Sequence, residues 1–170
     1  MESKIKFKDW FSNKLIVSRF PMPSEIEKSD CEVFINVSDE YIASCYKVAN
    51  RVGKSYFWFP MNECTKEIGL NSIYGALQIM YNAELENRKV YLHCHAGVNR
   101  SPTVMECYYF MRTGHFLEMK NSRLKTNIDF GHLPCLESIK IFLKQCQDSF
   151  NIDETMRGGQ LDSIKKKSKC

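Results

Sequence analysis

The chain has 170 residues, of which 44% are hydrophobic and 26% charged, a composition typical of a single globular domain. Lys and Arg number 24 and Asp and Glu 20, so the formal net charge is +4, which suits an anionic substrate without requiring nucleic acid. No apolar run approaches the roughly 18 residues of a membrane span, and the N-terminal sequence lacks the apolar segment of a signal peptide. We therefore expect a cytoplasmic protein without a membrane span.

Short β-type runs alternate with helical periods over residues 30–113. Strands are predicted at 15–17, 32–37, 56–59 and 89–93. Helices are predicted at 41–52, at 72–87 with Asn71 as its cap, at 102–112 and at 134–147. The alternation predicts an α/β fold: a central, mostly parallel sheet of four to five strands, helices on both faces and a helical C-terminal part.

Two of these helices carry an apolar stripe that predicts a buried face. The stripes comprise Ile73, Ala76, Leu77, Met80 and Tyr81 in the first helix and Leu136, Ile139, Leu143 and Cys146 in the second. Residues 1–150 are expected to form one domain. From about residue 151 the periodicity ends and the sequence becomes polar, with lysines at 165–167 and 169, so 151–170 is predicted to be a flexible basic tail.

Eight cysteines are spread along the chain without a CxxC pair. Structural zinc sites use clustered ligand pairs, and disulfide scaffolds are short secreted chains, so the spacing indicates neither. We expect reduced cysteines that are mostly buried as small apolar residues. No metal or other cofactor is expected.

One cysteine differs from the others because it lies in the loop between the strand at 89–93 and the helix at 102–112. The loop reads His93-Cys94-His95-Ala96-Gly97-Val98-Asn99-Arg100-Ser101. A loop that enters a helix N-terminus points backbone N–H groups inward and forms a nest for a tetrahedral oxyanion. Arg100 can add a planar, bidentate donor. In this environment the pKa of Cys94 should fall well below ~8.5, which makes the sulfur a thiolate at neutral pH.

The pattern His-Cys-x5-Arg-Ser between a strand and a helix resembles the signature of the cysteine-dependent protein tyrosine phosphatases, and most of all the small dual-specificity phosphatases. The resemblance implies that Cys94 attacks phosphorus, that a carboxylic acid protonates the leaving oxygen and that water hydrolyses the phosphocysteine without a metal. It implies that His93 lies beneath the loop and helps to place the thiolate, and that Ser101 stabilises the departing thiolate. The phosphate-binding residues would be His95, Ala96, Gly97, Val98, Asn99 and Arg100.

The general acid is the point at which the chain departs from this family. The family has an Asp in the loop that precedes the signature, whereas residues 58–64 of this chain contain none. Glu63 is the nearest carboxylate and the expected acid, and Glu67 is closer to the following helix. Asp39 follows a strand, and we expect it to cap the next helix together with Ser38. Asp129 lies in a polar segment, and no role is assigned to it.

The resemblance implies a phosphorylated protein as substrate. A chain of this length has little room for the tyrosine-recognition loop of strictly phosphotyrosine-specific enzymes, so we expect a shallow cleft that accepts phosphotyrosine and also phosphoserine or phosphothreonine. Lipid phosphatases of the superfamily carry lysines inside the loop, whereas positions 95–99 hold none. A phosphoinositide substrate is therefore disfavoured.

Two alternatives remain at this point. The sequence Gly-x-Asn-Arg also resembles the RNA 5′-triphosphatases of this superfamily, which carry His where this chain has Ala96 and Thr where it has Ser101. Nucleic acid is a partner only under that alternative. The other is a pseudoenzyme that binds a phosphorylated ligand without hydrolysing it.

Overall fold

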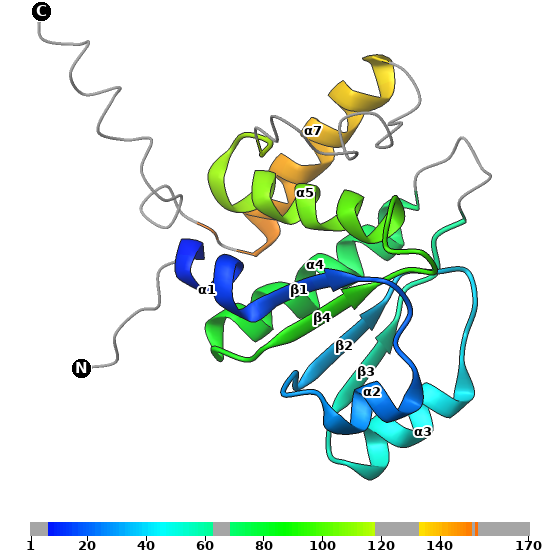
Figure 1. Cartoon of the computed structure of the whole chain (residues 1–170). Coiled ribbons are helices and arrows are strands. Elements are labelled where there is room, and N and C mark those ends of the chain that lie inside the picture. The colour runs from blue at the N-terminus through cyan, green and yellow to red at the C-terminus, as the bar shows by residue number, and fades with distance from the viewer. Residues whose placement is uncertain (1–6, 63–68, 118–132, 151, 153–170) are drawn as a thin grey trace, which may run out of the picture.

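A four-stranded parallel sheet with helices on both faces forms the core of the molecule (Figure 1). The computed structural model describes residues 7–62, 69–117, 133–150 and 152, with the backbone alone over 133–139. The strands are β1 (Leu15–Ser18), β2 (Val33–Asn36), β3 (Ser55–Trp58) and β4 (Val90–His93), in the order β1-β4-β2-β3. The helices are α1 (Phe7–Lys14), α2 (Pro23–Lys28), α3 (Ala43–Arg51), α4 (Leu70–Leu85), α5 (Arg100–Thr113) and α7 (Leu133–Ser149).

The alternation of side chains along the strands builds two hydrophobic layers. On one face Val33, Ile35 and Leu92 pack with α1, α4, α5 and α7. On the other face Phe34 and Tyr56 pack with α2 and α3. Because successive residues of a strand point to opposite faces, a sheet buried on both sides reads as a continuous apolar run, as β2 does. The predicted α/β architecture is confirmed.

The predicted apolar face of α4 is buried, but the predicted start of this helix is wrong. All five stripe residues of α4 are buried, and so are Leu143 and Cys146 of α7. The helix α4 begins at Leu70 with Gly69 at its N-cap position, so Asn71 lies inside the first turn and does not cap the helix. The Ile73 amide donates to Gly69 O at 2.9 Å as the first hydrogen bond of the helix, and Ser72 Oγ donates to Pro60 O at 2.6 Å and ties this first turn to the segment after β3.

A buried ion pair joins α4 to α5. Arg112 Nη2 lies 2.7 Å from Glu84 Oε1, and its Nε donates to Glu84 Oε2 at 2.9 Å. The Tyr108 hydroxyl donates to the same carboxylate. Both charged side chains are at most 6% exposed. A buried charge is costly unless it is paired and hydrogen-bonded, and these contacts between α4 and α5 meet that requirement.

The carboxyl ends of β2, β3 and β4 meet at one edge of the sheet. Asn36 is in register with His93 on one side and with Trp58 on the other. In parallel α/β sheets the loops at this edge form the binding site. The segment after β2, the segment after β3 and the loop after β4 are therefore brought together there. Among the helices that the structure describes, none combines the length and apolar character that a membrane span requires.

Candidate active site

The loop after β4 wraps around the sulfur of Cys94. The Gly97 amide and the Ser101 hydroxyl both donate to Cys94 Sγ at 3.3 Å. Burial raises the pKa of the Cys94 thiol, but hydrogen bonds from the Ser101 hydroxyl and from the backbone amides of Ser101, Gly97 and Asn99 outweigh it and leave this pKa below its usual value. The residue is 2% exposed. The loop is thus arranged to stabilise a thiolate at the N-terminus of α5.

The loop can adopt this shape because Gly97 has a positive φ of 73° and lies against the backbone that follows β1. A Cβ atom at Gly97 would come within 2.5 Å of the Ser18 carbonyl carbon and 2.6 Å of the Arg19 nitrogen. The Phe20 amide also donates to His95 O at 3.0 Å. The end of β1 therefore supports the loop from outside. The side chains of His95, Ala96 and Val98 are exposed, so their contribution to anion binding would come from the backbone.

Beneath the loop, His93 is fully buried and hydrogen-bonded through both ring nitrogens. Its Nδ1 lies 3.2 Å from Cys94 O and its Nε2 lies 3.1 Å from the Tyr56 hydroxyl. A carbonyl oxygen only accepts, so Nδ1–H donates to it and Nε2 accepts from Tyr56. Burial lowers the pKa of His93 to about 4, so the ring is neutral at physiological pH. His93 therefore contacts the backbone of Cys94 at the foot of the loop.

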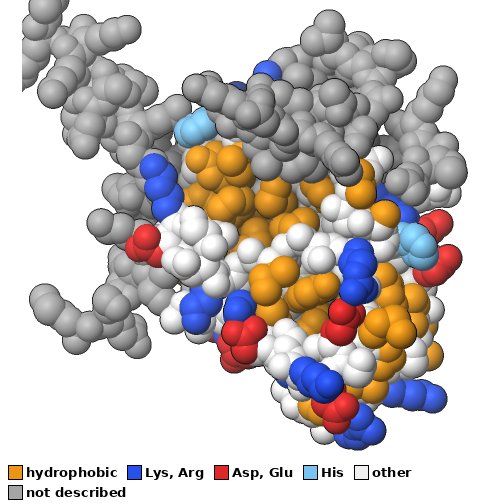
Figure 2. Space-filling view, in the orientation of Figure 1, with side chains coloured by type: hydrophobic (Ala, Val, Ile, Leu, Met, Phe, Trp, Pro, Cys, Tyr) orange, Lys and Arg blue, Asp and Glu red, His pale blue; other side chains and the backbone are white. Residues whose placement is uncertain are grey.

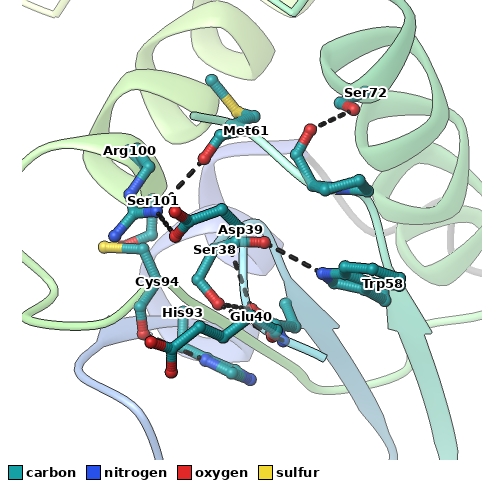
Figure 3. Close-up of polar contacts among 12 residues, drawn as sticks. Ser38, Asp39, Glu40, Trp58, Met61, Ser72, His93, Cys94, Arg100 and Ser101 are labelled. Carbon is teal, nitrogen blue, oxygen red and sulfur yellow. Dashed lines mark hydrogen bonds and ion pairs between the residues drawn. The ribbon is translucent and has the colours of Figure 1, made fainter. Parts of the chain in front are cut away.

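Arg100 is 6% exposed and points to the segments that follow β2 and β3. Its Nη1 donates to Asp39 Oδ1 at 2.6 Å and to Met61 O at 3.1 Å (Figure 3). The hydrogen bond from Arg100 is the main reason that the pKa of Asp39 is lowered, and a bond from its own backbone adds to it. Asp39 is therefore ionised at neutral pH.

The expectation that Asp39 and Ser38 cap the following helix is wrong. The helix α3 begins at Ala43, and Ile42 stands at its N-cap position without a side-chain cap. The Ser38 hydroxyl instead donates to Asn36 Oδ1 at 2.7 Å, and Asp39 binds Arg100. The segment after β2 stays close to the end of β4, because the Val37 amide donates to His93 O at 2.9 Å and Asp39 binds Arg100, and α3 begins only at Ala43.

Several predicted residues lie outside the described part of the chain. They are Glu63, Glu67, Asp129, the side chains of Leu136 and Ile139, and the tail apart from Ile152. The described residues nearest to Glu63 in sequence are Met61 and Asn62. The contact of Met61 O with Arg100 brings this segment to the edge of the site.

Sequence reasoning missed two contacts of the loop, that of Tyr56 with His93 and that of Asp39 with Arg100. Both contacts join residues far apart in sequence, 37 and 61 positions respectively. The available signal was the strand prediction itself, because Asp39 and Tyr56 belong to neighbouring predicted strands or their ends.

Comparisons with known proteins agree with this geometry. The family model "Dual specificity phosphatase, catalytic domain" matches residues 17–129. The chain belongs to the dual-specificity phosphatase family. It is a cysteine-dependent phosphatase. No curated protein sequence matches the chain.

Solved structures share the fold of this phosphatase at low sequence identity. Tk-PTP in its active form has a TM-score of 0.60 and 18% identity, covering 87% of this chain and 99% of the other. PTPMT1 has a TM-score of 0.60 and 16% identity, covering 84% of this chain and 98% of the other. The catalytic core of the PP-IP phosphatase SIW14 from S. cerevisiae has a TM-score of 0.58 and 17% identity, covering 82% and 89%.

We expect Ser101→Ala to move the acidic limb of the pH dependence to higher pH. The Ser101 hydroxyl stabilises the charged sulfur, so its removal raises the pKa of Cys94 and a higher pH is needed to form the thiolate. On the acidic side, alkylation of Cys94 by iodoacetamide should be slower by roughly tenfold or more. Mass spectrometry of the Cys94 peptide over a pH series measures this directly. Thr113→Ala, which removes a hydroxyl at the far end of α5, is the matched control; identical pH profiles for both variants would contradict the prediction.

Proposed function

We propose that this phosphatase hydrolyses phosphotyrosine, and also phosphoserine and phosphothreonine, in proteins, through a phosphocysteine on Cys94. The observation that carries the proposal is the Cys94 sulfur, which accepts hydrogen bonds from Gly97 and Ser101 in the loop that Arg100 closes. Nucleophile, anion-binding amides and guanidinium thereby belong to one loop, which is the arrangement that displacement at phosphorus requires.

The reaction takes place in two displacements. The Cys94 thiolate attacks phosphorus, the bond to the leaving oxygen breaks, and an acid gives that oxygen a proton. The loop amides and Arg100 hold the other phosphoryl oxygens as negative charge develops on them. Water then attacks the phosphocysteine and gives a proton back to the carboxylate that protonated the leaving oxygen, the P–S bond breaks, and inorganic phosphate leaves. The Ser101 hydroxyl, 3.3 Å from Sγ, stabilises the thiolate as it departs.

The charges around the loop support a substrate with a single phosphate. Positions 95–99 contain no Lys or Arg, and the Asp39 carboxylate lies beside Arg100. A second phosphate close to the first would meet this carboxylate without a cation from the loop to balance it. Two structural relatives are described with more anionic ligands, PTPMT1 in complex with PI(5)P and SIW14 as a PP-IP phosphatase. We propose that this chain differs from them.

The surface beside the loop supports a peptide substrate. Three aromatic residues, Tyr41, Tyr46 and Trp58, are 48%, 42% and 39% exposed, and the Tyr41 ring lies 5.3 Å from that of Trp58. Trp58 Nε1 donates to Ser38 O at 2.9 Å, which places this aromatic group next to Asp39. Apolar side chains that flank a phosphorylated residue would pack on it.

The distribution of charge gives no support to an extended nucleic-acid surface. On the face that Figure 2 shows, basic side chains of the described residues lie next to acidic ones instead of gathering in one patch. The ion pairs Arg19–Glu25, Arg51–Glu27 and Lys89–Asp30 follow this pattern. A protein that binds a nucleic-acid backbone usually presents a continuous basic stripe.

Substrate profiling with the full chain tests the proposal. Turnover should be highest for phosphotyrosine peptides, measurable for phosphoserine and phosphothreonine peptides, and low for phosphoinositide vesicles and triphosphate-ended RNA. A preference for RNA γ-phosphate or for the lipid would replace the proposed substrate, and binding of phosphopeptides without turnover of any ester would indicate a pseudoenzyme.

We also propose Glu63 as the general acid. It follows Met61, whose carbonyl oxygen contacts Arg100, by two positions. An acid matters most for a leaving oxygen that is strongly basic, so Glu63→Gln should slow serine and threonine esters by about 10²-fold or more and activated aryl phosphates much less. It should also remove the high-pH limb of the pH profile, because that limb reports the loss of the acid's proton.

The measurement is kcat over aryl phosphates of graded leaving-group pKa. Glu67→Gln removes a carboxylate from the same segment and serves as the matched control. If Glu63→Gln and wild type depend equally on leaving-group pKa, Glu63 is not the acid.

A further inference from the structure

The contact between Asp39 and Arg100 joins an exposed carboxylate to a buried guanidinium. The Asp39 side chain is 55% exposed and that of Arg100 is 7% exposed, yet the two are 2.6 Å apart. Exposed ion pairs are usually loose, because holding two side chains in one geometry costs entropy. A reason for this pair to be ordered has to come from the segment that carries Asp39.

That segment is held by a buried polar network directly beneath Asp39. The Ser38 amide and hydroxyl donate to Asn36 Oδ1 at 2.9 and 2.7 Å, and Asn36 Nδ2 donates to Glu40 O at 2.8 Å. Trp58 Nε1 donates to Ser38 O from the neighbouring strand. Asn36 is fully buried and Ser38 is 1% exposed. Figure 3 shows this network between β3 and the loop of Cys94.

The network fixes the backbone on both sides of Asp39. Asn36 bonds residues 38 and 40, so the turn around position 39 has little freedom. Side chains held by packed and hydrogen-bonded neighbours lose little further entropy when they make a contact. Met61 O accepts from the same Nη1 at 3.1 Å. The guanidinium is therefore hydrogen-bonded to the segments that follow β2 and β3.

We propose that Asp39 is a positioning residue for phosphoryl transfer: it orients the Arg100 guanidinium toward the anion-binding loop, and the Asn36–Ser38–Trp58 network exists to hold it there. The inference rests on the proposed function, in which Arg100 binds the phosphoryl group. Two other roles would give different results. As a general acid Asp39 would need a proton, which its contact with Arg100 opposes, and as an inhibitory acid it would compete with phosphate.

The first experiment compares Asp39→Asn with Glu40→Gln. Both remove one carboxylate from adjacent positions, but only Asp39 contacts Arg100, so net charge is matched. For Asp39→Asn we expect kcat/KM on aryl phosphates to fall by about 10²-fold, the usual cost of a misplaced catalytic group. The loss should be the same for every leaving group, and Glu40→Gln should stay within about twofold of wild type.

The second experiment asks whether Asp39 acts through Arg100. In an Arg100→Lys background there is no guanidinium fork to orient, so adding Asp39→Asn should cost less than about twofold. Equal melting temperatures for Asp39→Asn and Glu40→Gln separate this effect from a loss of fold.

The third experiment needs no turnover and therefore separates this inference from the proposed function. With Cys94→Ser as the starting chain, the affinity for inorganic phosphate is measured by calorimetry. Adding Asp39→Asn should weaken phosphate binding relative to adding Glu40→Gln. If phosphate binding follows this pattern while no ester is hydrolysed by the wild type, the proposed function fails, and what remains of the inference is that Asp39 orients Arg100 for anion binding.

Three results would overturn the inference. A loss that grows with leaving-group pKa would make Asp39 the acid. Tighter phosphate binding in the Asp39→Asn chain than in the Glu40→Gln chain would make Asp39 a competitor of the substrate. Full additivity of Asp39→Asn and Arg100→Lys would show that Asp39 does not work through the guanidinium.

Discussion

Cys94→Ser is expected to abolish turnover. The hydrogen bonds from Gly97 and Ser101 lower the pKa of the Cys94 thiol and so favour the thiolate, but the pKa of a serine hydroxyl is far too high for the same loop to ionise it. Turnover of phosphotyrosine peptide should fall below detection. Binding of inorganic phosphate should persist, because the amides and Arg100 are unchanged.

Cys45→Ser is the matched control for this substitution. Cys45 is also buried, and its Sγ donates to Pro21 O, a contact that a serine hydroxyl can replace. It should keep its activity. Appreciable turnover in a clean preparation of Cys94→Ser would rule out the phosphocysteine mechanism.

Arg100→Lys should reduce turnover almost as far. Lysine keeps the charge but loses the planar fork that can follow two phosphoryl oxygens and, in this structure, also bonds Asp39 and Met61. Loss of donors to the developing charge predicts a decrease in kcat of about 10³-fold. Steady-state turnover of an aryl phosphate measures it, with Arg51→Lys on the exposed face of α3 as the control. Wild-type kcat in Arg100→Lys would mean that Arg100 does not face the phosphate.

Local patterns predicted the central part of the fold and of the site. The loop 93–101 could be recognised because all its chemistry is contiguous: Cys94, Gly97, Arg100 and Ser101 stand within eight residues of sequence. The end of α5 was predicted for the same reason, since Gly114 adopts the left-handed conformation that closes a helix.

The features that were not predicted depend on distant parts of the chain. The helix α1 has few apolar residues of its own, and it is placed by Trp10, whose indole donates to the Arg88 carbonyl at 3.0 Å across 78 positions. The short α2 begins with Pro23 and is held by Lys54, whose Nζ donates to Ser29 O at 2.5 Å. Asp39 looked like a helix cap because its partner Arg100 lies 61 positions away. Patterns within a short stretch of sequence do not reveal contacts between residues that are far apart in the chain.

The support that the end of β1 gives to Gly97 has a consequence for the order in which the enzyme becomes active during synthesis. β1 pairs with β4, which directly precedes Cys94, and the residues at the end of β1 support Gly97. The loop and the strand that supports it are therefore synthesised far apart in time. The pairing of strands that lie this far apart in sequence is among the slower steps of folding. Until it happens, Cys94 is an ordinary thiol with a pKa near ~8.5. A ribosome-bound or half-folded chain therefore exposes no activated sulfur, and the reactive group appears only when the whole sheet is in place.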